Sequence, residues 1–477
     1  MKSLEVHPTD GLAKLKLNEI LQLAARHCIG EEGREAVLAL CPQTDPAEVK
    51  AELERVDEFR RLLNSSHRLA INYLPPITRL LNSLRAGTPF LTAEELLLFL
   101  RWLRTLNGVL AFFKTHKSEY PKLAELYLTT PPNPTWISKI EQIITEDGQI
   151  RPNASPYLVK LRHQQADLSA QLRQTLQIIL REAKSQGWTD EKELTIRNQR
   201  LVIPIKSDFK GKIKGLIQDL SSSGQTTYLE PLQAVGLNND LRELYLKEEN
   251  EIRRLLIEVT EELRPHVEEL IPAAQYLARV DSLRARAMLA IQLGCNLVHL
   301  DQNGREFTLI QARHPLLIAE KGLQHVVPLE LRLDSVRRIL VISGPNAGGK
   351  SVALQTVGLL QLMLQTGFLV PANSKSTFPI IRRIFVDLGD NQSIQNDLST
   401  YSSHLSLMKV ITERYESNSL LLLDEFGAGT DPQLGGAIAE ALLREFARRR
   451  GFGVINTHYS NLKEVAEELP ALVNGAM

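Results

Sequence analysis

One eight-residue stretch constrains this chain more than any other. It reads Gly344-Pro-Asn-Ala-Gly-Gly-Lys-Ser351 and matches the pattern G-x-x-x-x-G-K-[ST]. Residues 338–343 before it are mostly apolar and predict a buried strand, and residues 352–364 after it have helical periodicity. A strand, a glycine-rich loop and a helix in this order are the structural context in which the pattern binds phosphate.

The chemistry of such a loop comes from its backbone and from the helix that follows it. Backbone N–H groups surround phosphate oxygens, and the helix start adds a partial positive charge. Lys350 is placed to reach the β- and γ-phosphates, and the Ser351 hydroxyl to ligate Mg²⁺. The alternative is a glycine turn that binds nothing. We therefore predict an ATP and Mg²⁺ site with these cofactor-binding residues: Gly344, Pro345, Asn346, Ala347, Gly348, Gly349, Lys350 and Ser351.

A second motif, Leu420-Leu-Leu-Leu-Asp-Glu425, is a run of four apolar residues that ends in two acids. A buried parallel strand would deliver Asp424 to the Mg²⁺ shell at its carboxyl end. Glu425 is then the candidate that polarises the attacking water. The alternative is a solvated turn after a core strand. Ser351 and Asp424 are accordingly the predicted metal ligands.

Two further polar residues complete the predicted catalytic set. Residues 453–458 predict another strand, which delivers His458 to the same edge. A lone histidine is usually structural, but this position favours contact with the γ-phosphate or its water. Gln392, in the polar stretch 389–404, is a further candidate. The catalytic candidates are therefore Glu425, His458 and Gln392.

Composition narrows the class of protein. A length of 477 residues suggests about three domains. The 56 basic and 56 acidic residues cancel, so any nucleic-acid surface has to be local. The three cysteines lack metal spacing, which is typical of a reducing compartment. The start of the chain shows no signal segment, and we expect no run that approaches the roughly 18 apolar residues of a membrane span. These features predict a cytoplasmic protein without a membrane partner.

The remaining chain predicts helices around a small β-rich segment. Two long helices, at about 155–186 and 237–263, predict an antiparallel coiled coil, because each alone exposes an apolar stripe. Between them, four alternating segments predict strands at 193–197, 201–206, 213–217 and 226–229. The predicted domains are a helical core (1–150), a coiled-coil clamp with a β-rich tip (151–265), a return helix of the core or lever (266–300) and an α/β P-loop ATPase domain (301–477).

The predicted tip is locally basic. Between residues 192 and 214 it carries seven lysines and arginines against two acids. Such strands would contact phosphates without reading bases. An ordinary solvated β edge guarded by lysines fits equally well, so both interpretations stay open. The nucleic-acid candidates are Arg197, Arg200, Lys206, Lys210, Lys212 and Lys214.

The sequence resembles the MutS ATPase family at several places in order. They are the phosphate loop with its Pro-Asn pair, Ser399-Thr-Tyr-Ser-Ser-His404, the stretch 424–431, and Asn456-Thr-His-Tyr459. Upstream, residues 198–206 and 219–226 resemble the second bacterial MutS subfamily. The resemblance therefore covers most of the chain from about residue 140.

This resemblance implies an ABC-type ATPase that forms a homodimer through its ATPase domains. Ser399 of each chain would approach the γ-phosphate held by Lys350 of the other. ATP-driven closure would gate binding of branched or double-stranded DNA, or of the ribosome and its rRNA. The subfamily is linked to suppression of homologous recombination and to splitting of collided ribosomes. It usually carries a C-terminal Smr nuclease domain, and because the chain ends at residue 477 we expect truncation before that domain and no endonuclease activity.

Two alternatives come from other classes. A DNA mismatch-repair recognition ATPase needs an aromatic-bearing wedge domain, for which we find no room before residue 150. A chromosome-bridging module of the SMC type would insert its coil between the two Walker motifs, whereas the predicted coil precedes both.

Overall fold

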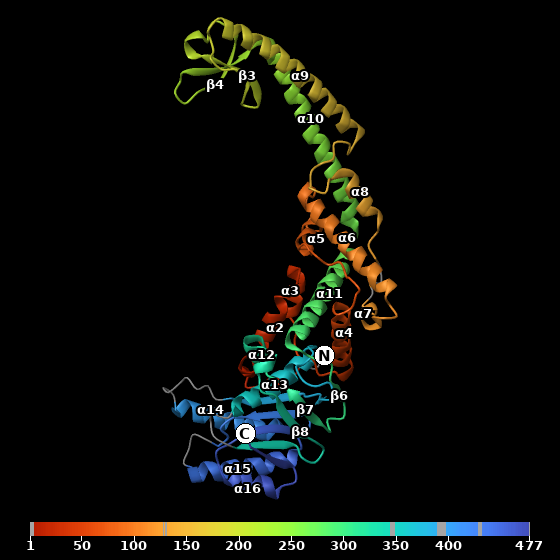
Figure 1. Ribbon diagram of the computed structural model, residues 1–477, viewed down its shortest axis with the longest axis vertical. Helices are drawn as coiled ribbons and strands as arrows, with labels where there is room; N and C mark the ends of the chain where they lie inside the picture. The colour runs from red at the N-terminus through yellow and green to blue at the C-terminus, as the bar shows by residue number, and fades with distance from the viewer. Residues whose placement is uncertain are drawn as a thin grey trace. The chain divides into compact units, whose positions relative to one another are not determined.

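The computed structural model describes residues 4–126, 128, 131–343, 349–388, 397–427 and 432–476 (Figure 1). The chain folds into two compact units. The first unit comprises Met1–Pro76, Thr105–Thr129 and Pro272–Met477, and the second comprises Ile77–Arg104 and Thr130–Ile271. Helices α6 (Ala93–Thr115) and α11 (Val267–Leu293) contribute residues to both units.

A six-stranded parallel sheet forms the centre of the first unit, with the strand order β1-β11-β12-β13-β9-β14. Strands β12 and β13 are buried along their whole length, as parallel strands covered on both faces require. The strands are β1 (Glu5–His7), β9 (Ile339–Ser343), β11 (Arg383–Asp387), β12 (Ser419–Leu423), β13 (Phe452–Asn456) and β14 (Leu472–Ala476). The strands predicted before the phosphate loop and at both later motifs are confirmed.

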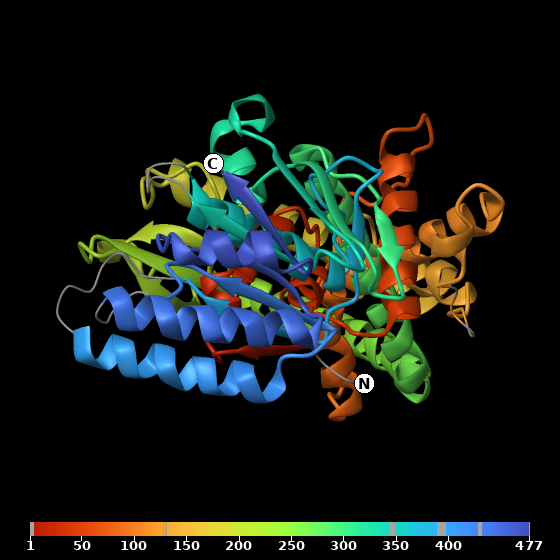
Figure 2. The same ribbon diagram turned by 90° about the horizontal axis from the view of Figure 1, so that it is seen from below.

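Strand β1 corrects an expectation about the N-terminal region. The sequence predicted only helices in residues 1–150, but residues 5–7 pair in parallel with β11, with Glu5 opposite Arg383. Figure 2 shows this short red strand beside the blue strands of the sheet. Three residues are too few for an alternating pattern to be recognised. The predicted boundaries at 150, 265 and 300 stay predictions.

Helices cover the sheet of the first unit. Helix α13 (Lys350–Gln365) contacts β12 and β13. Apolar residues of α14 (Asp397–Arg414), α15 (Pro432–Arg449) and α16 (Asn461–Glu468) share one buried core with the central strands. Figure 2 shows α14 and α15 side by side. The other elements of this unit are α1 (Gly11–Lys14), α2 (Leu17–Ala25), α3 (Glu31–Leu38), α4 (Pro46–Leu63), α7 (Pro121–Ala124), α12 (Pro315–Lys321), η3 (Leu323–His325), and a four-stranded sheet of β6 (His299–Asp301), β10 (Thr377–Pro379), β7 (Phe307–Ala312) and β8 (Leu329–Leu333).

The second unit contains the predicted pair of long helices. They are α9 (Pro156–Ser185) and α10 (Leu232–Leu263), which lie side by side in Figure 1. Arg162 Nε donates to Glu248 Oε1 (2.7 Å) and Gln165 Nε2 to the Leu244 carbonyl (3.3 Å), so the two helices are antiparallel, as predicted. Gln165 interrupts the apolar seam, but its Nε2 also donates to Glu248 Oε2 (2.8 Å), so its amide N–H groups are satisfied. The unit also holds α5 (Ile77–Arg85), α8 (Thr135–Ile143) and η2 (Arg264–His266).

The predicted strands of the β-rich tip are confirmed. They form an antiparallel sheet in the order β2-β3-β5-β4. Ile203, Ile205 and Leu229 of this sheet share a buried core with Leu176 and Leu180 of α9. The tip is therefore packed onto the helices that carry it. Its elements are β2 (Thr195–Arg197), β3 (Arg200–Lys206), η1 (Ser207–Phe209), β4 (Gly215–Leu220) and β5 (Thr226–Pro231).

Helix α6 corrects the expectation that no apolar run approaches the length of a membrane span. Among the described residues it is the one helix long and apolar enough to cross a membrane, judged by length and composition only. Half of its apolar window is buried inside the protein. Phe99, Trp102 and Leu106 are at most 1% exposed. Because a core helix passes the same test, its burial accounts for its composition.

A buried ion pair links helices of the first unit. Arg286 on α11 is 2% exposed, and its guanidinium donates to Glu52 Oε2 and to the Gly367 carbonyl, each at 3.0 Å. Arg279 Nη2 also donates to Glu52, at 2.6 Å. Burial by itself would raise the pKa of Glu52, but the charges of Arg286 and Arg279 outweigh it and lower this pKa to about 2.

Glu52→Ala is expected to lower the free energy of unfolding by about 3–5 kcal/mol, because it leaves Arg286 buried without its counter-ion. Glu54→Ala is the control on the same helix. Its pairs with Lys50 and Lys122 span 3.8 and 3.9 Å, so about 1 kcal/mol or less should be lost. Because the folded-state pKa of Glu52 is lowered, its contribution is present above about pH 4.5 and is lost as the pH falls towards 2. Calorimetry across this range measures both effects, and equal destabilisation by the two substitutions would contradict the assignment.

Candidate nucleotide site

The candidate site lies where four parallel strands end together. The register pairs Ile342 of β9 with Asn456 of β13, and Leu423 of β12 with Asp387 of β11. Strand β13 lies between β9 and β12. The carboxyl ends of these strands therefore form one edge, and Asp424 follows directly after β12. Ligands of parallel α/β sheets bind outside this edge.

The helix predicted after the phosphate loop is α13, which begins at Lys350. Gly349 precedes it with φ +82° and ψ +16°, a left-handed conformation that residues with a Cβ seldom adopt. Lys350 is 2% exposed, whereas Ser351 is exposed at the helix start. Residues 344–348 lie outside the described part of the chain, so their phosphate contacts stay predictions.

Asp424 is held in place by neighbours on two strands. Its side chain is 8% exposed, and its Oδ1 accepts hydrogen bonds from the Asn456 side-chain amide and from the Glu425 N–H (3.1 Å). Asn456 is 2% exposed, and its Oδ1 is buried without a hydrogen-bond partner in the described structure. The sequence motif contains Asn456 but does not by itself assign it a role. Its position at the end of buried strand β13 is the signal that identifies it as a positioning residue.

Glu425 occupies a strained position on an otherwise restrained turn. It has φ +50° and is exposed. A left-handed backbone at a residue other than glycine is costly, and such strain gathers at functional sites. On one side Phe426 N–H donates to the Asn456 carbonyl (2.9 Å), and on the other the Tyr459 hydroxyl donates to the Gly427 carbonyl (3.0 Å). A Cβ on Gly427, at φ +93°, would lie 2.8 Å from Cε2 of Tyr459, so only glycine fits this turn.

A histidine–aspartate pair adds to the edge and was not among the predicted site residues. His404 Nδ1 on α14 lies 2.6 Å from Asp387 Oδ2, at the end of β11. Hydrogen bonding to Asp387 raises the pKa of His404 despite its partial burial, and the charge of Glu425 raises it further. The pair therefore places a titratable polar group at the same edge as Glu425. The sequence signal that could have identified this pair is Asp387, an acid at the end of an apolar strand.

The other predicted residues are placed to different degrees. His458 follows β13 by two residues and is exposed beside the same edge. Ser399 is the third residue of α14, but its side chain is outside the described part. Gln392 lies outside the described residues altogether. Their roles stay predictions.

The described residues fit a nucleoside triphosphate with a divalent cation. A hydroxyl at an exposed helix start (Ser351) and a carboxylate (Asp424) are oxygen donors of the kind that Mg²⁺ prefers. Lys350 and the start of α13 supply positive charge for phosphate. The unpartnered Asn456 Oδ1 leaves an acceptor beside Asp424 for a bound water.

The tip residues divide into two groups. Arg197, Arg200 and Lys206 pair with Asp219 (3.2 Å), Glu230 (2.6 Å) and Asp190 (2.9 Å), and Glu230 is fully buried. The count over residues 192–214 missed these acids because the fold brings them in from outside that window. Lys210, Lys212 and Lys214 are exposed. They are the stronger candidates for contact with an external phosphate.

The chain is similar to known proteins both in this part and over almost its whole length. The family model described as MutS domain V matches residues 340–477, which contain all but the first residue of β9 and the whole of α13, β11, β12 and β13. The chain is 36% identical over 475 residues to a protein named Endonuclease MutS2 from Caldanaerobacter subterraneus, which covers 98% of this chain and 58% of that relative. Proteins of the same name from Halalkalibacterium halodurans and Gemmatimonas aurantiaca are 34% and 33% identical, and each covers 98% of this chain. The chain spans less than three fifths of these relatives' lengths.

Proposed function

Because the chain belongs to the MutS family, and within it to the MutS2 subfamily, we propose that it is a dimeric ATPase that clamps nucleic acid under nucleotide control. The observation that carries the proposal is the convergence of Lys350, Asp424 and Glu425 with Asn456 and His404 at one sheet edge. Members of the MutS family are ATPases. The proposed setting is the cytoplasm.

Each residue of this edge has a distinct proposed task. Lys350 and the N–H groups at the start of α13 bind the β- and γ-phosphates. Ser351 and Asp424 hold Mg²⁺, which supplies charge neutralisation when bound. Glu425 accepts a proton from the attacking water, and His458 contacts that water or the γ-phosphate. Asn456 keeps the Asp424 carboxylate in one orientation through its side-chain amide.

The proposed assembly is a homodimer whose ATPase domains complete each other's sites. Ser399 lies in the first turn of α14, and a helix start attracts anions. Presented by the partner chain, this helix start would contact the γ-phosphate and make closure depend on ATP. The α9–α10 pair and its tip would then grip branched DNA or the ribosome. By likeness to the subfamily, the proposed roles are suppression of homologous recombination and splitting of collided ribosomes.

Sedimentation with a four-way DNA junction and, separately, with ribosomes tests this function. We expect ATP to shift the chain towards a dimer and to change its co-sedimentation with one of the two ligands. The ligand that responds to ATP identifies the class of substrate. Identical sedimentation with and without ATP, for both ligands, would contradict the proposal.

The tip lysines set the expected salt dependence of that binding. Replacing Lys210, Lys212 and Lys214 together with serine should reduce the slope of log affinity against log salt by about 2–3, because up to three phosphate contacts are lost. The control replaces the exposed lysines Lys114, Lys321 and Lys375, which changes the net charge equally. An unchanged slope in the tip variant would make the tip an ordinary solvated β edge.

A further inference from the structure

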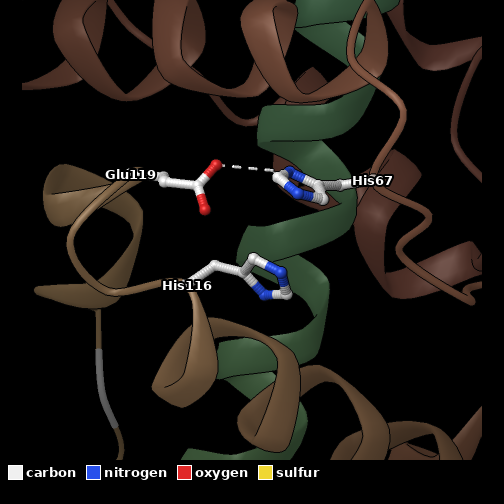
Figure 3. A group of neighbouring side chains, drawn as sticks. All are labelled: His67, His116 and Glu119. Carbon is white, nitrogen blue, oxygen red and sulfur yellow. Dashed lines mark ion pairs between the residues drawn. The ribbon is translucent and has the colours of Figure 1, made fainter.

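Two histidines and a glutamate of the first unit come together outside the candidate nucleotide site. They are His67, His116 and Glu119, and one potential ligand atom of each lies within 4.8 Å of the others. Figure 3 shows the Glu119 carboxylate pointing towards the His67 ring, with the His116 ring next to both. In the part of the chain that the structure describes, they are the one group of three such residues with this spacing.

Packed helices fix the spacing of these residues. His67 lies shortly after α4, and His116 and Glu119 lie in the turn between α6 and α7. Helix α4 is joined to α7 by a buried hydrogen bond in which Leu123 N–H donates to Glu58 Oε2 (3.0 Å). The cluster therefore bridges two chain segments that are already held together, which favours a preorganised site.

The hydrogen bond of His116 determines which of its nitrogens is available. Nδ1 lies 3.0 Å from the Phe112 carbonyl oxygen, which can only accept, so Nδ1 carries the ring proton. Nε2 then keeps its lone pair. Metal-bound histidines use this arrangement, in which one nitrogen donates to a backbone carbonyl and the other binds the ion. The ring also stacks on Phe112, with centroids 4.4 Å apart, so its orientation is fixed.

His67 and Glu119 have the spacing of two ligands of one ion. Nδ1 of His67 is 3.4 Å from Oε2 of Glu119. Ligands about 2.0–2.1 Å from a tetrahedral zinc ion lie about 3.3–3.4 Å apart. The Tyr120 hydroxyl is 3.0 Å from the same Nδ1 and 3.3 Å from Ser65 Oγ, to which it can donate. Tyr120 can therefore keep a hydrogen bond to Ser65 when Nδ1 gives up its proton to bind a metal.

An ion pair between His67 and Glu119 would not explain why the ring of His116 lies beside them. The His67 and His116 ring centroids are 4.5 Å apart with an interplanar angle of 54°, so the rings are tilted rather than stacked. Two protonated imidazoles at this distance would repel each other. A divalent cation would instead be bound by a lone pair of each imidazole and by the Glu119 carboxylate.

We propose that His67, His116 and Glu119 bind one divalent transition-metal ion, with zinc as the best match. Imidazole donors favour zinc and related ions, whereas Mg²⁺ and Ca²⁺ prefer sites built from oxygen. Three protein ligands leave a fourth position for water. The bound ion would tie the segment after α4 to the turn between α6 and α7, and so stabilise the first unit.

The test uses the full chain, stripped of metal and titrated with zinc by calorimetry in excess Mg²⁺, which occupies oxygen-rich sites. We expect one zinc per chain and a rise in melting temperature on zinc addition. His67→Ala, His116→Ala and Glu119→Gln should each weaken zinc binding at least about 10-fold and reduce that rise. Cobalt in place of zinc should produce the visible absorption of a four-coordinate site in the wild type but not in these three variants.

The controls are an exposed histidine and an exposed thiol elsewhere in the chain. His163→Ala on α9 and Cys41→Ser should retain the wild-type zinc affinity. Glu119 is half exposed, so Glu119→Gln should fold normally and isolates the loss of a ligand. Failure of the wild type to bind zinc at about 100 μM, or unchanged affinity in all three ligand variants, would overturn the proposal.

Discussion

Lys350→Ala is expected to lower the affinity for ATP by more than about 100-fold. Charge-assisted hydrogen bonds contribute about 1.5–3 kcal/mol each, and Lys350 is predicted to reach two phosphates. Its side chain is 2% exposed at the start of α13, so no other lysine can replace it from solvent. Calorimetric titration with ATP in the presence of Mg²⁺ measures the effect directly.

The control for this variant is Lys375→Ala, which removes an exposed lysine of the same unit. It should bind ATP like the wild type. Circular dichroism and the melting temperature show whether either variant is misfolded. If Lys350→Ala binds ATP with wild-type affinity, the assignment of residues 344–351 as the phosphate loop is wrong.

Glu425→Gln is expected to reduce ATP hydrolysis by about 100- to 10,000-fold while ATP affinity stays close to that of the wild type. The amide preserves the size of the side chain but cannot accept a proton from water. Asp424, the predicted Mg²⁺ ligand, keeps its hydrogen bonds from Asn456 and the backbone, so the cation site is left intact. Single-turnover hydrolysis, measured beside equilibrium binding, separates the two effects.

The matched control is Glu413→Gln, an exposed glutamate on α14. Its turnover should equal that of the wild type. Wild-type turnover in Glu425→Gln would place the proton acceptor elsewhere, and the His404–Asp387 pair would then be the first alternative. Loss of ATP binding together with turnover would instead mean that Glu425 supports the cation site.

Much of the fold was predictable because its elements have strong local patterns. The paired helices α9 and α10, the tip strands and the strands β9, β12 and β13 all follow from hydrophobic patterns and turn residues. The three-residue strand β1 was not predictable, because its identity depends on β11, far away in the chain. Burial likewise decides that α6 is a core helix, although its composition alone would also suit a membrane.

The sequence predicted the site residues that belong to a recognisable motif. It did not predict the residues on neighbouring strands that hold them in place. The sequence indicated Asp424 and Glu425 at a strand end, but not the amide of Asn456 that holds Asp424. In the tip, a count of charges along the chain treated Arg200 as available for phosphate. The fold pairs it with buried Glu230, 30 residues away.

The amino-acid pattern alone thus specified the phosphate loop, the acidic strand end and the long helical pair, because a periodicity or a short motif carries each of them. Only the folded chain decided which charges are already paired and which side chains meet, as in His404 with Asp387 and His67 with His116. Those outcomes depend on contacts between distant segments, which strand pairing and helix packing create and which no local stretch of sequence contains.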